Sequence, residues 1–369
     1  MYLLPKPKTI KEQDGQMLLC HSTHIVMTKE VAETEMHAAK RLQEAIRQET
    51  GLILPFSVGE VREGDLSLGI AKTLPEQTYE ITIDEKGGQI SGGDGAGVLY
   101  GVETFCQIVQ QCGGILPCVQ IQDAPDMPNR GYYFDQTRGR VLKLEELKKI
   151  ADRMCRYKLN QLQLYVEHTY LFRDFSEMWR DQTPITAEEI RELDSYCRER
   201  HIELVPSLAS FGHLCTLLST KTYGDLCEME DSWKEPFSFW NRMRYHTINV
   251  SDGRSLPLIK KMIAEYMQLF SSDKFNICAD ETFCLGKYKS KELAKECGIH
   301  RLYIDYVKEL AQFLVENGKI PMFWGDIIWN SPELMKELPE TMVCLNWGYA
   351  PEQREDETRA IAQTGAMQY

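Results

Sequence analysis

The amino-acid sequence predicts an α/β protein in which a (β/α)8 barrel of the TIM type follows a small α/β domain. The turn-rich stretch Asp123–Asn129 separates two parts of different pattern. Before it, strand-like runs, helical periodicity and a hairpin signal are mixed. After it, short apolar strands alternate with longer amphipathic helices, which is typical of βα units around a parallel sheet. We therefore expect a small domain at residues 1–125 and a barrel domain at residues 126–369.

The first domain is expected to contain both strands and helices. The stretch Ala32–Glu49 has apolar residues at helical spacing and stops at Gly51, a residue suited to the end of a helix. The run Tyr79–Asp84, followed by Glu-Lys-Gly-Gly and Gln-Ile-Ser, predicts a β-hairpin. A second helix is expected at Gly95–Gln111. The remaining predicted strands are Met17–Met27, Leu52–Val58, Asp65–Ile70 and Leu116–Gln122.

The second domain is expected to repeat strand and helix. Thr186 and Glu189 form the capping-box pattern at one helix start. We count about six and a half of the eight units of such a barrel, with a seventh strand expected to begin where the sequence ends. The predicted strands are Gly131–Asp135, Gln161–Val166, Glu203–Leu208, Phe275–Ala279, Pro321–Trp324 and Met342–Trp347. The predicted helices are Lys143–Tyr157, Ala187–Arg200, Leu256–Phe270, Arg301–Asn317, Pro332–Glu337 and Pro351–Gln363.

Composition narrows the class of function. The chain has 369 residues, 43% of them hydrophobic and 26% charged, which is typical of a globular protein. A net charge of -13 argues against nucleic acid or an anionic membrane as partner and is compatible with a neutral sugar. Neither a membrane span nor a signal peptide is visible. The 12 cysteines include no CxxC pair, so we expect reduced thiols in a cytoplasmic protein.

Polar and aromatic side chains follow each predicted barrel strand, at the end where barrel enzymes place their active sites. Carboxylates can bind sugar hydroxyls, and indole faces can stack on a pyranose. The ring therefore suits a sugar. Its members are Asp135, Glu167 with His168, His213, Asp280 with Glu281, Trp324 with Asp326, and Trp347.

Each of these residues also has a plain structural interpretation. Asp-Glu dipeptides recur at Asp84 and Asp356, but only Asp280-Glu281 directly follows a buried-looking strand. His213 could be a structural loop histidine, and the two tryptophans could be core residues. Glu167-His168 resembles part of a metal site, yet no second histidine cluster supports one, so we expect neither a metal nor a cofactor.

Several motifs, in order along most of the chain, resemble glycoside hydrolase family 20, the β-N-acetylhexosaminidases. Asp280-Glu281 resembles the catalytic Asp-Glu of that family. The other resembling segments are Val98-Leu-Tyr-Gly-Val-Glu-Thr-Phe-Cys-Gln, Val119-Gln-Ile-Gln-Asp-Ala-Pro, Arg130-Gly-Tyr-Tyr-Phe-Asp-Gln-Thr-Arg, Lys158-Leu-Asn-Gln-Leu-Gln-Leu and Phe211-Gly-His.

The resemblance implies an exo-acting, retaining hydrolase that removes terminal β-linked N-acetylhexosamine by substrate-assisted catalysis. Glu281 would be the general acid and then the general base. Asp280 would orient the 2-acetamido group as its oxygen attacks C1. The resemblance also implies that Arg130 binds sugar hydroxyls, that His213 pairs with the acid/base region and that Trp324 and Trp347 form aromatic walls. We add Glu167, His168 and Asp326 to the expected substrate-binding residues, whereas Asp135 and Arg138 look like structure at the barrel mouth.

Two departures from the family pattern leave alternatives open. Cys278-Ala279 replaces the usual two glycines, and Tyr165-Val-Glu-His-Thr replaces the usual motif after the second strand. The family's later pocket residues would lie from Tyr369 onward. A non-catalytic sugar-binding barrel, or a glycosidase of another family that uses Glu167 with Glu281, is therefore the alternative hypothesis. The choice between GlcNAc and GalNAc and the oligomeric state stay open.

Overall fold

The computed structural model describes residues 1–352 and 355–368 and divides into two compact units. The first unit comprises residues 1–132, 145–162 and 195–203, and the second comprises residues 133–144, 163–194 and 204–369. The domain boundary near residue 125 stays a prediction. The predicted helix Pro351–Gln363 falls partly on residues outside the described ranges.

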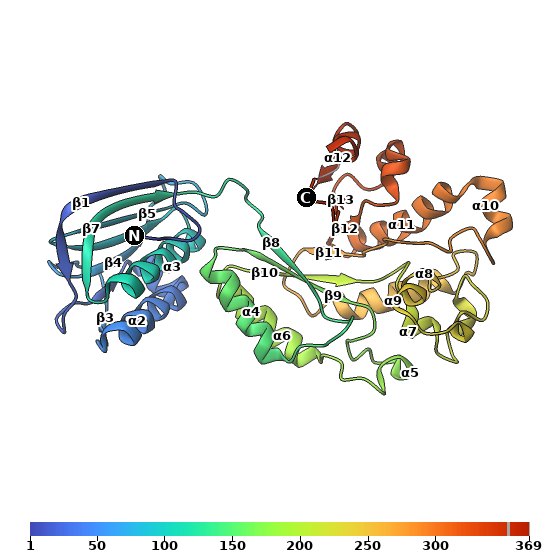
Figure 1. Cartoon of the computed structure of the whole chain (residues 1–369), viewed down its shortest axis with the longest axis horizontal. Coiled ribbons are helices and arrows are strands. Elements are labelled where there is room, and N and C mark those ends of the chain that lie inside the picture. Colours follow the sequence, from blue (N-terminus) through green and yellow to red (C-terminus); the bar gives the residue numbers. More distant parts are fainter. Residues whose placement is uncertain (353–354, 369) are drawn as a thin grey trace. The chain divides into compact units, whose positions relative to one another are not determined.

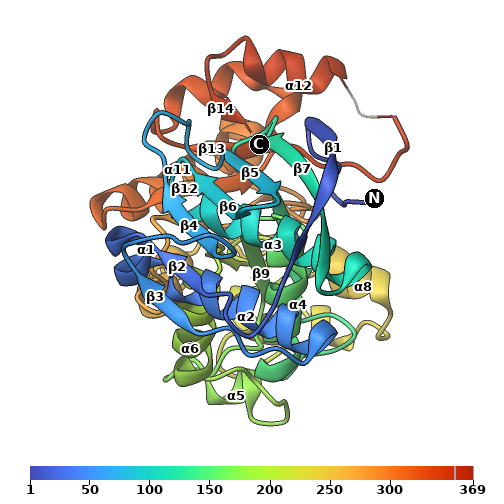
Figure 2. The ribbon, with the colours of Figure 1, turned by 90° about the vertical axis from the view of Figure 1, so that its left-hand side faces the viewer.

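The first sheet has seven strands in the order β1-β7-β5-β6-β4-β2-β3, and its central strands can be followed side by side in Figure 2. The pairs of β7 and the β5–β6 hairpin are antiparallel, whereas β4 pairs with β2 and β6 in parallel. Helices α2 and α3 cover one face of this sheet (Figure 1). The strands are β1 (Thr9–Leu18), β2 (Ile25–Met27), β3 (Phe56–Val58), β4 (Leu66–Ile70), β5 (Tyr79–Asp84), β6 (Gly87–Gly92) and β7 (Ile115–Asp123), and the helices are α1 (Lys29–Thr34), α2 (Met36–Thr50) and α3 (Gly95–Cys112).

The second sheet also has seven strands, ordered β14-β13-β12-β11-β10-β9-β8, and the pairs from β10 to β14 are parallel. Strands adjacent in the chain are thus neighbours in the sheet, which curls as a partial barrel. Its strands are β8 (Gly131–Asp135), β9 (Gln161–Val166), β10 (Glu203–Leu208), β11 (Lys274–Asn276), β12 (Ile320–Trp324), β13 (Val343–Leu345) and β14 (Met367–Gln368). The connecting helices are α4 (Leu144–Arg156), α6 (Ala187–Arg198), α9 (Ser255–Met267), α11 (Ile299–Glu316), the 3-10 helix η4 (Pro332–Glu337) and α12 (Glu355–Ala362).

The predicted alternation of strands and helices is confirmed, with a seventh strand at Met367–Gln368. The capping box is also present, because the Thr186 hydroxyl accepts the Glu189 N–H and the Glu189 carboxylate accepts the Thr186 N–H. Val205, Met322 and Val343 form a buried apolar cluster across the strands of this sheet. In the described part of the chain, no helix is both long and apolar enough to cross a membrane.

Three strand predictions were wrong in their bounds. Of Leu52–Val58, only Phe56–Val58 is a strand. The stretch Met17–Met27 is not one strand, because residues 19–24 leave the sheet between β1 and β2. The fourth barrel strand ends at Asn276 rather than Ala279, since the backbone that follows is left-handed. The loops at the strand ends also carry short helices that the periodicity did not indicate, namely α5 (Ser176–Trp179), α7 (Cys215–Leu218), α8 (Phe239–Arg244) and α10 (Lys291–Cys297).

Candidate active site

The Asp280-Glu281 pair lies just beyond β11, on a backbone that most residues avoid. Cys278, Ala279 and Glu281 have φ angles of 59°, 63° and 49°. This left-handed region is unfavourable for residues with a Cβ atom, and such residues gather at functional sites. The strand therefore cannot continue through Ala279, and the chain turns so that both acidic side chains enter one cavity.

His213 bridges the two carboxylates. Its Nε2 atom lies 3.2 Å from Asp280 Oδ2 and 3.3 Å from Glu281 Oε2. The preceding residue, Gly212, allows this approach, because a Cβ atom there would lie 2.5 Å from the Asp280 carbonyl oxygen. His213 is itself in the left-handed region, with a φ of 60°. The glycine is thus required by close packing of two loops.

The electrostatics of this cluster favour a charged histidine. Burial alone would lower the pKa of His213, but Asp280, Glu281 and Glu167 outweigh burial and raise the pKa to about 10. At neutral pH the imidazolium therefore stabilises the nearby negative charge of the two acids. The Oδ1 atom of Asp280 is buried and has no hydrogen-bond partner among the described residues. This oxygen is an acceptor that a ligand could use.

Asp326 holds the backbone of the Asp280-Glu281 pair in place. Its Oδ2 atom accepts the backbone N–H of Glu281 at 3.0 Å, which fixes the turn. Burial, and then the neighbouring Asp280 carboxylate, raise the pKa of Asp326 to about 7. Asp326 does not line the cavity of the acidic pair but lines an adjoining one of about 300 Å³ that shares Trp347.

The cavity that holds Asp280 and Glu281 has a volume of about 570 Å³ and largely aromatic walls. Trp324 and Trp347 both line it, as the sequence led us to expect. Tyr133 meets Trp324 edge to face at 5.0 Å between ring centres. Flat rings around two carboxylates form a surface that suits a sugar ring. The further lining residues are Arg138, Tyr165, Phe239, Trp240, Met243, Gly348 and Tyr349.

Glu167 is near this cavity but does not line it. The side chain is 3% exposed, accepts the Tyr165 hydroxyl at 2.9 Å and forms an ion pair with Arg242 at 2.6 Å. Burial raises the pKa of Glu167, while Arg242 opposes that rise. The geometry is that of a buried, paired carboxylate, and the sequence-based hypothesis of direct sugar contact by Glu167 finds no support here.

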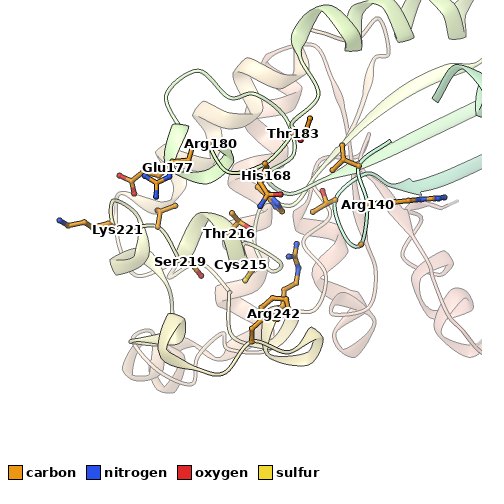
Figure 3. Close-up of a pocket in the computed structure, with 16 residues that line it drawn as sticks. Arg140, His168, Glu177, Arg180, Thr183, Cys215, Thr216, Ser219, Lys221 and Arg242 are labelled. Carbon is orange, nitrogen blue, oxygen red and sulfur yellow. The ribbon is translucent and has the colours of Figure 1, made fainter. Parts of the chain in front are cut away.

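His168, like Glu167, does not line the cavity of Asp280 and Glu281. It lines a second cavity, of about 940 Å³, whose residues are drawn in Figure 3. Asp280 and Glu281 do not line this second cavity. Consecutive residues of one motif, Glu167 and His168, therefore have different surroundings.

The two arginines of the Arg130–Arg138 motif exchange the roles that the sequence suggested. Arg130 lies in the first unit, where its guanidinium donates to the carbonyls of Lys158 and Met127 at 2.9 and 2.6 Å. Its donors also reach Gln77 and Tyr100, and Arg130 does not line the cavity of the acidic pair, so these contacts favour a structural role. Arg138 instead lines the cavity of the acidic pair, held by Asp135 at 2.6 Å.

Sequence reasoning also missed several aromatic walls of the cavity. Tyr133 and Tyr165 lie within strands, where alternation could have placed them on the inner face. Phe239 and Trp240 lie on α8, a short helix inserted between β10 and α9. Their signal was a dense aromatic run, Phe237-Ser-Phe-Trp, in an otherwise polar loop.

His213, Asp280 and Glu281 are the described group that could most readily hold a metal, because their ligand atoms lie within 4.8 Å of one another. A metal needs the lone pair of a neutral imidazole. In the metal-free cluster, the raised pKa of His213 favours an imidazolium whose Nε2 proton lies between the two carboxylates. We therefore interpret the group as a charged hydrogen-bonded cluster suited to proton transfer.

Comparison with known proteins connects this geometry to a family. The family model described as glycosyl hydrolase family 20, domain 2, matches residues 1–124, and the model of the family's catalytic domain matches residues 128–367. A β-hexosaminidase of Porphyromonas gingivalis is 24% identical over 363 residues, which cover 88% of this chain and 45% of that protein. A β-hexosaminidase of Vibrio furnissii is 26% identical over 310 residues, which cover 76% and 48%. The chain thus spans about half the length of these curated relatives.

Solved structures share the fold. A β-N-acetylhexosaminidase from Bacteroides fragilis has a TM-score of 0.79 at 18% identity, covering 99% of this chain and 74% of that one. An exo β-N-acetylglucosaminidase from Vibrio harveyi, in complex with N-acetylglucosamine, has a TM-score of 0.80 at 19% identity, covering 98% and 59%. With two family models matched along nearly its whole length, this chain belongs to glycosyl hydrolase family 20.

Proposed function

We propose that the protein is an exo-acting, retaining β-N-acetylhexosaminidase that uses substrate-assisted catalysis. The observation that carries the proposal is the His213 bridge, which holds Asp280 and Glu281 together at one end of an aromatic-walled cavity. Family membership and the similarity to β-hexosaminidases support the same reaction.

The two acids would have different tasks. Glu281 protonates the departing glycosidic oxygen and later removes a proton from the attacking water. Asp280 accepts the acetamide N–H through its unpaired Oδ1 and stabilises the positive charge that forms as the acetamide oxygen closes on C1. The C1–O bond to the aglycone breaks, a C1–O bond to the acetamide forms, and water then opens the ring with retention.

The environment of Glu167 favours this mechanism over one with two enzymatic carboxylates. A nucleophile must reach the sugar, but Glu167 is buried, paired with Arg242 and absent from the cavity lining. Asp280 is the carboxylate that shares the cavity with Glu281. The substrate's own acetamide is therefore the better nucleophile.

Release of p-nitrophenol from the β-GlcNAc and β-GalNAc chromogenic substrates tests the proposal. We expect turnover by the wild-type protein and a loss of about 10²–10⁴-fold in Glu281→Gln. A thiazoline analogue of GlcNAc should inhibit the wild type. Binding of GlcNAc in a calorimeter without any turnover would instead support the alternative of a non-catalytic sugar-binding barrel.

We infer a cytoplasmic location from the cysteines. All 12 are free, and eight of them are buried. Unpaired thiols persist in reducing compartments. Cell fractionation followed by immunoblotting tests this location, and recovery of the protein from the culture medium would contradict it.

A further inference from the structure

The second cavity, of about 940 Å³, is built from the same loops as the catalytic cavity (Figure 3). Neighbouring residues face the two spaces. Arg138 lines the catalytic cavity, whereas Thr137 and Gly139 line the second. On α8, Met243 lines the first and Arg242 the second. The two cavities therefore share their walls and lie on the same side of the sheet, at the strand ends.

The buried side chain of Glu167 lies between a lining residue of each cavity. Glu167 Oε1 lies 4.0 Å from Arg138 Nε, and Glu167 Oε2 lies 3.9 Å from His168 Nδ1. Arg138 lines the catalytic cavity and His168 lines the second. A chain of two or three sugar units is long enough to span such a separation.

The lining of the second cavity carries an excess of positive charge. Arg140, Arg180, Lys221 and Arg242 line it, and the carboxylate among the lining residues is Glu177. Arg242 is already paired with the buried Glu167, and Arg180 with Asp181. Glu177 already accepts the Thr222 hydroxyl at 2.6 Å. Arg140 and Lys221 form no ion pair with any residue in the described ranges, and they lie on opposite sides of the cavity in Figure 3. This local excess contrasts with the net charge of -13 for the whole chain.

Two buried side-chain nitrogens among the cavity's lining residues lack hydrogen-bond partners. His168 is 4% exposed, and its Nδ1 atom has no hydrogen-bond partner in the described part of the chain. The same holds for Nε of Arg242, whose side chain extends toward His168 in Figure 3. Burial, and then the charge of Arg242, lower the pKa of His168 to about 4, so the ring is neutral at pH 7 and has one N–H to donate. A buried donor without an acceptor is unfavourable, which favours an acceptor as ligand.

We propose that this second cavity binds an oxyanion, either a carboxylate or a sulfate ester, on a sugar unit that follows the terminal N-acetylhexosamine. The inference rests on the proposed function, because it places the leaving part of the same glycan there. Carboxylate and sulfate oxygens only accept hydrogen bonds, which matches the imidazole, guanidinium and hydroxyl donors of His168, Arg242 and Thr216. A neutral sugar would bring no counter-charge to Arg140 and Lys221, which form no ion pair in the described part of the chain.

Kinetics with matched oligosaccharides test this subsite. Each probe has a terminal β-GlcNAc, followed within two units by glucose, glucuronic acid or glucose 6-sulfate. We expect kcat/KM to be about tenfold higher for an acidic probe than for the neutral one, falling toward equality as salt rises. A preference for glucuronic acid alone identifies the carboxylate as the ligand, and a preference for the 6-sulfate alone identifies the sulfate ester.

Variants then locate the effect. The ratio of acidic to neutral kcat/KM should fall about tenfold in His168→Leu and in the double variant Arg180→Gln/Lys221→Gln. The matched control Lys308→Gln removes an exposed lysine of α11 that lines neither cavity, and it should keep the wild-type ratio. A wild-type ratio near one, or an unchanged ratio in both cavity variants, would overturn the proposal.

Direct binding separates this proposal from the catalytic one. Calorimetry on Glu281→Gln measures binding of glucuronic acid, glucose 6-sulfate and glucose without turnover. If no β-N-acetylhexosaminide is hydrolysed by the wild type, the proposed function fails, and this titration alone decides the subsite. Binding of either acid that His168→Leu abolishes supports the subsite, whereas equal binding of all three sugars contradicts it.

Discussion

Two acidic centres stand beside each other in the second unit, and their hydrogen bonds differ. Glu167 has both oxygens in contact with donors, from Tyr165 and Arg242. Asp280 has one oxygen near His213 and the other buried without a partner among the described residues. A fully paired buried carboxylate stabilises or positions its neighbours, whereas an unpaired one at a cavity awaits a ligand. The comparison favours a catalytic role for Asp280 and a structural role for Glu167.

Of the two centres compared, the larger effect on activity is expected at Asp280. Asp280→Asn keeps the size of the side chain but removes the negative charge that would stabilise the oxazolinium ion. We expect kcat for p-nitrophenyl β-GlcNAc to fall about 10²–10³-fold. Asp84→Asn, in another Asp-Glu dipeptide, is the matched control and should retain wild-type kcat. A decrease of less than about tenfold in Asp280→Asn would place the charge stabilisation elsewhere.

Replacement of the paired carboxylate should reduce stability more than activity. Glu167→Gln leaves the mostly buried charge of Arg242 without its partner, since that pair is 2.6 Å long and both side chains are at most 16% exposed. We expect the free energy of unfolding to fall by about 3 kcal/mol in urea titrations. The folded variant should keep kcat within about tenfold of the wild type.

An exposed ion pair provides the control for that experiment. Glu292→Gln breaks the pair with Lys295, in which the glutamate side chain is 77% exposed. Exposed pairs contribute about 0–1 kcal/mol, so this change should be nearly silent. If Glu167→Gln were as stable as Glu292→Gln but inactive, Glu167 would be a catalytic carboxylate, and the two-carboxylate mechanism would return.

The contrast between a cavity-lining residue and a structural residue also applies to Arg138 and Arg130, the two arginines of the Arg130–Arg138 motif. Arg138→Gln removes a guanidinium from the catalytic cavity, and we expect kcat/KM to fall about 10–100-fold. Arg130→Gln removes donors that satisfy backbone carbonyls, so we expect a loss of about 1–3 kcal/mol of stability with kcat/KM nearly unchanged. Chromogenic assays and urea titrations on both variants measure the split. The opposite pattern would restore Arg130 as the sugar-binding arginine.

Much of the fold could be predicted because it depends on patterns that repeat along the chain. Alternating apolar strands and amphipathic helices indicated the barrel, and the Glu-Lys-Gly-Gly turn indicated the β5–β6 hairpin. The end of β11 could not be predicted, since the left-handed backbone at Cys278 and Ala279 contradicts the preference of those residue types. Tertiary packing sets that turn, and local sequence does not report it.

The candidate site was predictable only in part, for a similar reason. Position after a strand indicated Asp280, Glu281, Trp324 and Trp347, which line one cavity. It could not show that Glu167 is buried against Tyr165 and Arg242 or that His168 lines a second cavity, because tertiary contacts decide both. The aromatic residues of α8 come from an insertion, and no strand register connects an insertion to the cavity it covers.

The smallest expected effect concerns Asp326, which shares properties of both centres. It is mostly buried and bonded to the Glu281 backbone, yet its pKa is raised to about 7 from an ordinary value of 3.8. The unfolded carboxyl loses its proton near pH 4, whereas the folded one keeps its proton until about pH 7. Between these values the folded chain binds more protons, so this contribution to the free energy of unfolding is complete below pH 4 and is lost as the pH rises through 7.

Urea titrations at several pH values between 4 and 8 measure this contribution. Asp326 is partly exposed and interacts with Asp280, so we expect the wild type to lose on the order of 1–2 kcal/mol more than Asp326→Asn over that range. Asp14→Asn, at an exposed position, is the control and should follow the wild-type curve. If the wild type and Asp326→Asn have the same pH dependence, Asp326 is already ionised in the folded protein. Asp280, Glu281 and Asp326 would then place three negative charges near His213. This net negative charge would favour a cation over a neutral N–H donor at the unpaired oxygen of Asp280.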